Sequence, residues 1–180
     1  MDRLRWKLRK ERQSWMCIED KNVAFIEEVI FLNKQNISWN EVETYLKRFV
    51  EDKYIVEETK DVICIASDFP DEYTESKYTK SLRGSIAKAK ANASQVIGKM
   101  IVVATNKRWV KNKDRKHDKD AKKGWYRYDT YFGMPVQGSG ENEARVNIFR
   151  ATLVVRISLN GLFLYDVVNI KKEASKPLES

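Results

Sequence analysis

Histidine and cysteine are scarce in this chain of 180 residues. It has one histidine and two cysteines, and no CxxC, HxxxH or HExxH spacing occurs. Structural zinc sites use about four such ligands at short spacings, so a zinc site is not expected. Cys17 and Cys64 lie far apart in the sequence, and the absence of a disulfide framework fits a reducing cytosol. We expect neither a metal nor a cofactor.

Long hydrophobic runs and nucleotide-binding motifs are also missing. No apolar run approaches the roughly 18 residues of a membrane span, and the charged N-terminus lacks the apolar region of a signal peptide. We therefore expect a cytoplasmic protein without a membrane partner. Seven glycines and three prolines exclude a collagen-like chain. The absence of GxGxxG, P-loop and GxSxG motifs argues against dinucleotide enzymes, P-loop ATPases and α/β-hydrolases.

Positive charge is what the chain has in excess. The formal net charge is +8, and the stretch from Lys99 to Arg127 holds eleven Lys/Arg and three Asp/Glu. Such a field attracts phosphates, and neighbouring aromatic rings stack on bases. The sequence therefore predicts a nucleic-acid partner, RNA or DNA. The predicted binding residues are Lys107, Arg108, Lys111, Lys113, Arg115, Lys116, Lys119, Lys122, Lys123, Trp125 and Arg156.

The first 50 residues are predicted to be helical. Residues 2–16 have the pattern of a basic amphipathic helix, for which a nucleic-acid arm, a membrane-surface helix and a partner-docking helix all remain open. Residues 21–35 have a broad apolar face typical of a second helix. A third helix is expected to begin at a capping box formed by Ser38 and Glu41, and to run to about Val50.

The middle of the chain is predicted to contain a short hairpin and a basic helix. Residues 54–56 and 62–65 have the composition of two paired strands. The polar residues that follow contain Pro70 and are expected to form a loop. From Ser76 to about Gln95 the Ala- and Lys-rich pattern predicts one helix, which Gly98 is expected to close.

The C-terminal third is predicted to be an antiparallel sheet of about three longer strands, over residues 125–136, 146–158 and 162–170. Asn160-Gly161 between the last two is a strong hairpin signal, because both residues tolerate positive φ. The expected fold class is thus α+β: N-terminal helices, a short hairpin, a basic Ala-rich helix and this sheet. The expected domains are a helical extension over residues 1–50 and an α+β domain over residues 51–180.

A metal-independent ribonuclease needs few groups. It must take a proton from a 2′-hydroxyl, stabilise the phosphate charge and protonate the leaving oxygen. His117 lies inside the basic stretch and is a candidate for proton transfer. Arg127 lies on one predicted strand, and Arg150, Thr152 and Arg156 share a parity on the next, so a positive face of the sheet is expected.

Several phrases of the sequence resemble a domain of phage and mobile-element proteins from Firmicutes. They include ISWNEVETYLKRFV, KYTKSLRG, DAKKGWYRYD and LYDVVNIKKE, and the resemblance covers roughly residues 37–178. That domain is grouped with the barnase–EndoU–colicin–RelE-like nucleases. The resemblance implies an RNase-like fold, a bacterial host cell, and RNA cleavage without a metal.

By the same resemblance, four residues form the catalytic site. His117 is the general acid or base, Arg127 and Arg150 hold the phosphate, and Tyr126 orients or donates a proton. The sequence departs from the family pattern at Tyr131, where a basic residue is expected.

A counter-defence protein is the alternative hypothesis. A short, basic, mobile-element-derived domain can bind a host nuclease complex, such as a CRISPR effector, and block cleavage without catalysis. A virion or DNA-packaging accessory protein is a third. The first two both predict salt-sensitive binding to nucleic acid, but only the nuclease should depend on His117 for turnover.

Overall fold

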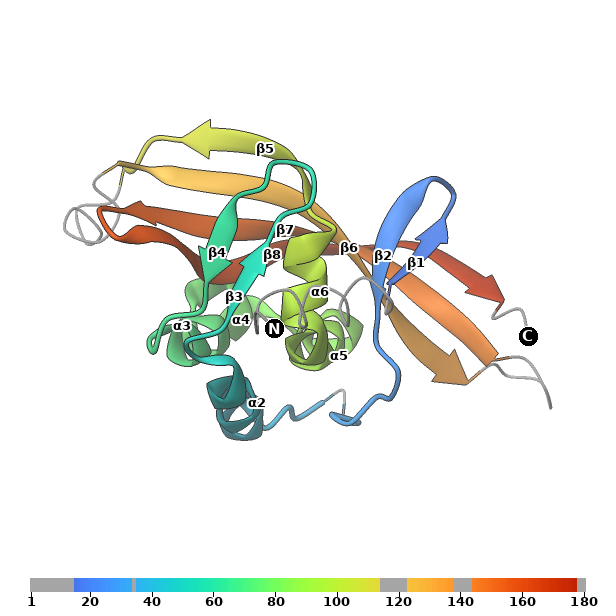
Figure 1. The fold of residues 1–180 in the computed structure, drawn as a ribbon. Coiled ribbons are helices and arrows are strands. Elements are labelled where there is room, and N and C mark those ends of the chain that lie inside the picture. Colours follow the sequence, from blue (N-terminus) through green and yellow to red (C-terminus); the bar gives the residue numbers. More distant parts are fainter. Residues whose placement is uncertain (1–14, 34, 114–122, 138–143, 178–180) are drawn as a thin grey trace.

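One large mixed β-sheet is the central element of this protein. The computed structural model describes residues 15–33, 35–113, 123–137 and 144–177, and an eight-stranded sheet lies within them (Figure 1). The strands are β1 (Trp15–Ile18), β2 (Lys21–Phe25), β3 (Lys53–Ile55), β4 (Val62–Cys64), β5 (Thr105–Val110), β6 (Trp125–Gln137), β7 (Ala144–Ser158) and β8 (Gly161–Pro177). Their order is β1–β2–β6–β7–β8–β4–β3, and β5 also pairs with β6.

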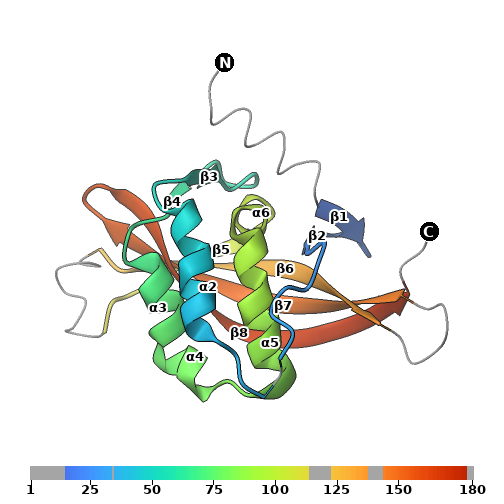
Figure 2. The ribbon, with the colours of Figure 1, turned by 90° about the horizontal axis from the view of Figure 1, so that it is seen from below.

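Short helices cover one face of this sheet. They are α2 (Trp39–Leu46), α3 (Phe69–Glu75), α4 (Lys77–Ser81), α5 (Gly84–Ala93) and α6 (Ile97–Val102), with single 3₁₀ turns at Lys47–Phe49 and Ser94–Val96. In Figure 2, α2, α3 and α5 lie in front of the long strands β6, β7 and β8. The main core forms between these two layers. It joins helix residues such as Tyr73 and Met100 to strand residues such as Tyr128, Phe149 and Leu153.

The long C-terminal hairpin confirms the Asn-Gly signal. β7 and β8 pair antiparallel, with Ser158 opposite Gly161 at the turn. Gly161 has a φ of 132°, a conformation that side-chain-bearing residues rarely adopt. Alternate residues of β7 enter the core, as expected for a strand with two different faces.

The predicted fold class is wrong in the size and make-up of its sheet. The N-terminal part contributes two strands, β5 adds another, and the hairpin of β3 and β4 is part of the same sheet. That hairpin itself was predicted correctly, with Tyr54 opposite Ile63. It joins the large sheet because β4 pairs in parallel with β8, with Cys64 opposite Phe163. A parallel pairing between residues about 100 positions apart leaves no local sequence signal.

The helix predicted over residues 21–35 is absent, and β2 stands in its place. Val23 and Phe25 face a small apolar cluster with Val146, whereas Ala24 and Ile26 enter the main core. The last three residues of β2 and the residue that follows them are therefore apolar and packed on both faces of the sheet, and such a run has the same composition as a buried helix.

The chain after β2 stays extended because a buried side chain satisfies its backbone. Asn92 of α5 accepts hydrogen bonds from the Ile30 and Phe31 amides at 3.0 and 3.1 Å, and donates to the Phe31 carbonyl at 2.9 Å. The Asn92 side chain thus pairs with this backbone as a neighbouring strand would.

The helix predicted over residues 2–16 lies almost entirely outside the described residues, and its last two residues belong to β1.

Three details of the helical layer also differ from the predictions. Ser38 makes no side-chain capping bond, so the predicted capping box is wrong. The helix predicted from Ser76 to Gln95 is broken by extended residues at Leu82 and Arg83 into α4 and α5. The predicted loop around Pro70 contains α3, with proline in its first turn, where no amide donor is needed.

Gly98 does not close a helix but lies inside α6. A Cβ at this position would overlap the Tyr54 ring of β3. The glycine therefore serves close packing between α6 and β3 rather than a helix end. No described helix has the length and apolar character needed to span a membrane.

Candidate nucleic-acid interface

The face of β5, β6 and β7 that points away from the helices carries a cluster of arginines; we call it the outer face. On β6, every second residue of this face is charged or aromatic. These residues are Trp125, Arg127, Asp129 and Tyr131, and they lie opposite Arg156, Val154, Thr152 and Arg150 of β7. On β5, Arg108 lies directly opposite Arg127.

Asp129 is the hub of a polar network on this face. Its carboxylate accepts a hydrogen bond from Asn106 at 2.8 Å, and pairs with Arg108 at 3.2 Å and Arg150 at 3.0 Å. Burial would raise the pKa of the Asp129 carboxyl, but the Asn106 hydrogen bond and the two arginines outweigh it and lower the pKa. Asp129 is therefore an ionised anchor that holds two arginines in place.

Arg127 differs from its neighbours because it has no anchor. No hydrogen bond or ion pair joins its guanidinium to another described residue, and its Nε is buried without a partner. A buried donor without an acceptor typically costs about 1–3 kcal/mol. Within the described part of the outer face, Arg127 is the arginine whose charge is available to a ligand.

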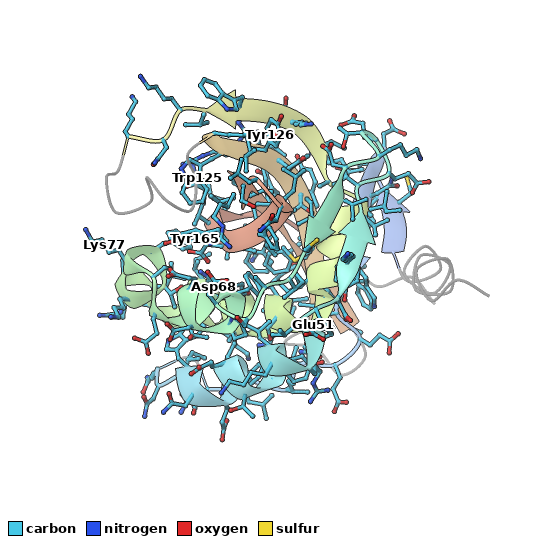
Figure 3. All side chains as sticks on the ribbon, turned by 60° about the vertical axis from the view of Figure 1, so that its left-hand side comes forward. Glu51, Asp68, Lys77, Trp125, Tyr126 and Tyr165 are labelled. Carbon is cyan, nitrogen blue, oxygen red and sulfur yellow. The ribbon has the colours of Figure 1, made fainter. Side chains whose placement is uncertain are left out.

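A cavity of about 220 Å³ lies beside Arg127. Its walls are mostly hydrophobic, and they comprise Trp125, Arg127, Val154, Tyr165, Asp166 and Val168. The Trp125 and Tyr165 rings meet edge to face with their centroids 5.0 Å apart. Both lie on the same side of the molecule in Figure 3. The cavity thus combines aromatic surface with an unpaired cation.

Tyr126 lies on the opposite face from Arg127, as consecutive strand residues must. Its ring packs against the main core, and the Lys107 ammonium lies 4.1 Å from the ring centroid. Lys107 in turn pairs with Asp61 at 2.8 Å, and Asp61 accepts the Tyr128 hydroxyl at 2.6 Å. This second cluster fastens the β3–β4 turn to β5 and β6. The structure therefore separates Tyr126 from the two arginines with which it was expected to act.

The remaining predicted residues fall into three groups. Arg156 is paired with Asp68 at 3.0 Å, and Trp125 is largely buried. Lys111, Lys113 and Lys123 are exposed, and they follow Val110 of β5 or precede Trp125 of β6, two residues that lie opposite each other in the sheet. His117, Arg115, Lys116, Lys119 and Lys122 lie outside the described residues.

A cation of the outer face that the sequence did not reveal is Lys21. Its ammonium lies 4.8 Å from the centroid of the Tyr131 ring. Tyr131 is where the resembled family is expected to carry a basic residue, and Lys21 of β2 brings a positive charge to that position instead. Only the parallel pairing of β2 with β6 brings the two residues together.

The sequence did not predict Asp129 or Asn106 as residues of this site. Asp129 lies two positions after Arg127 on the same predicted strand, and this spacing could have placed both on one face of the sheet. No such signal exists for Asn106, which sits at a register shift in β5 with a φ of 55°.

Within the described ranges, no group of three His, Cys, Asp or Glu side chains is placed to hold a metal ion.

No family model, curated protein or solved structure matches this chain.

Proposed function

We propose that this protein binds nucleic acid through the outer face of β5, β6 and β7. The observation that carries the proposal is Arg127, a half-buried cation with no partner among the described residues, next to a cavity with aromatic walls. Phosphate oxygens satisfy guanidinium donors at short range. Arg108 lies opposite Arg127, and Arg150 and Lys21 lie further along β6, at Asp129 and Tyr131, where they attract the rest of the phosphate backbone.

Cleavage is a separate question from binding. Of the four residues expected to be catalytic, Arg127 and Arg150 share the outer face, and Tyr126 lies on the other side of the sheet. Asp129 is the carboxylate nearest to these arginines in the register, and its lowered pKa makes it a weak proton acceptor. Metal-independent RNA cleavage therefore depends on His117.

The separation of Tyr126 from the arginines favours a second candidate function. A non-catalytic counter-defence protein, which binds a nuclease–nucleic acid complex and blocks cleavage, needs the basic face but no proton-transfer group. The resemblance to phage and mobile-element domains supports either candidate.

The test is an incubation with end-labelled RNA and DNA in EDTA, with binding and cleavage measured together. The variants are Arg127→Gln, His117→Ala and, as a matched control, Arg48→Gln, which removes the same charge from the helical layer. We expect Arg127→Gln to weaken binding and to reduce the slope of log K against log salt by about 0.7 for a single strand or 0.9 for a duplex. Equal binding by Arg127→Gln and Arg48→Gln would contradict the proposal.

His117→Ala then separates the two candidates. RNA cleavage that is lost in His117→Ala while binding persists supports the ribonuclease. Binding without cleavage in the unmodified protein supports the counter-defence protein, and the next assay is inhibition of a CRISPR effector nuclease.

A further inference from the structure

The cavity beside Arg127 has the chemical character of a site for a flat aromatic ring that is linked to an anion. Its surface is mostly hydrophobic, with two aromatic side chains among its walls. The polar atoms of both aromatic side chains make hydrogen bonds. Trp125 Nε1 donates to Asn112 Oδ1 at 3.4 Å, and the Tyr165 hydroxyl donates to the Glu72 carboxylate of α3. The rings are therefore fixed before any ligand arrives, which lowers the entropic cost of binding.

The two charged side chains of the cavity wall, Asp166 and Arg127, differ in whether they already have a partner. Asp166 is already paired, because its Oδ1 accepts from the buried Lys90 ammonium at 2.6 Å. Arg127 is unpaired, and its Nε is enclosed. Among the residues that line the cavity, Arg127 is thus the charged side chain without a described partner, and a ligand anion would satisfy its donors.

We propose that this cavity receives one unstacked nucleobase, whose phosphate binds Arg127, so that the preferred ligand is a single strand. The inference rests on the proposed function and specifies its substrate class. A base inside a duplex is stacked and paired, and it cannot enter a cavity without being flipped out. A single strand presents its bases at no such cost, and stacking on aromatic side chains is tolerant of sequence.

The neighbouring charges fit the same ligand. Lys111, Lys113 and Lys123 are exposed at the ends of β5 and β6, close in sequence to Trp125. A strand anchored by one base at the cavity would have its adjacent phosphates within this positive field. The cavity thus supplies preference for single strands, and the lysines supply salt-dependent affinity.

The experiment compares the affinities for a labelled single strand and its duplex at one salt concentration. Val168→Phe fills the cavity, and Val62→Phe makes the same change at an exposed position of β4 as a control. We expect the unmodified protein to prefer the single strand. Val168→Phe should weaken single-strand binding by about 10-fold, as loss of one stacked base does, and leave duplex binding unchanged.

Each outcome separates this inference from the proposed function. Equal affinity for both ligands, with loss of both in Arg127→Gln, overturns the base-binding cavity and leaves nucleic-acid binding standing. Single-strand affinity that is the same in Val168→Phe and Val62→Phe also overturns the cavity. Binding to neither ligand overturns both proposals.

A measurement on the unmodified protein covers the case in which Val168→Phe does not fold. A nucleoside monophosphate and ribose phosphate compete against the labelled single strand. Better competition by the nucleoside monophosphate is expected, because only it carries the base. Equal competition would mean that the site recognises phosphate alone, and would overturn the inference.

Discussion

At the scale of single residues, the Asp129 carboxylate determines which arginines of the outer face are paired. Asp129 restrains Arg108 and Arg150 and leaves Arg127 unpaired. Restrained arginines are positioned but partly neutralised, whereas an unpaired one keeps its full charge for a ligand. The balance between folding stability and binding on this face therefore depends on Asp129.

Replacing Asp129 with asparagine should shift that balance. We expect Asp129→Asn to lower the free energy of unfolding by about 1–3 kcal/mol, because charge-assisted hydrogen bonds are lost in a site that is largely buried. The same change should tighten nucleic-acid binding, since two arginines are released. Urea unfolding and binding at low salt measure the two effects.

Glu41→Gln is the matched control for this change. It raises the net charge equally at an exposed position of α2, in the helical layer, so its effect on stability should be under about 1 kcal/mol. If both variants tighten binding equally, net charge rather than the outer face controls affinity.

At the scale of elements, a buried ion pair joins the helical layer to the sheet. Lys90 of α5 and Asp166 of β8 are 2.6 Å apart, and their side chains are 0% and 3% exposed. Burial lowers the pKa of the Lys90 ammonium and raises the pKa of the Asp166 carboxyl, while their attraction opposes both shifts. The pair fixes α5 against the strand that contributes to the cavity.

Breaking this pair should be far more harmful than replacing it. Lys90→Met leaves a buried carboxylate without its partner, and we expect it to lower the free energy of unfolding by about 3–5 kcal/mol. Adding Asp166→Leu should recover most of that loss, because no charge then remains buried. Denaturant titrations of the single and double variants measure both values, and a double variant no more stable than the single one would contradict the expectation.

At the scale of the whole molecule, two carboxylates link distant segments across the sheet. Asp61 fastens the β3–β4 turn to β5 and β6, and Asp129 joins β5, β6 and β7. Burial would raise the pKa of the Asp61 carboxyl, but hydrogen bonds from Lys107 and Tyr128 outweigh it and lower the pKa. Both carboxylates thus release their protons more readily in the folded protein than in the unfolded chain.

Stability should therefore fall on acidification. Below about pH 4, the unfolded chain binds protons that the folded protein excludes, so the contribution of Asp61 and Asp129 is complete above that pH and is lost below it. We expect the Asp61→Asn/Asp129→Asn variant to lose less stability than the unmodified protein between about pH 5 and pH 3. Asp20→Asn, at an exposed turn, is the control, and parallel curves for all three proteins would contradict the prediction.

Local sequence signals determined the parts of this protein whose contacts are local. The Asn160-Gly161 turn, the hairpin of β3 and β4, and the shared parity of Arg150, Thr152 and Arg156 follow from turn chemistry and from the two-residue repeat of a strand. The net charge and the density of lysines and arginines likewise follow from the sequence without knowledge of the fold.

Tertiary structure alone decided the rest, because it depends on pairings between distant segments. Residues 21–25 form a strand because β2 pairs with β1 on one side and with β6 on the other, and their apolar run is equally suited to a buried helix. The same pairing brings Lys21 over Tyr131. Whether an arginine is paired or unpaired depends on which carboxylate the folded sheet places beside it, and for Arg127 that is a property of the whole outer face.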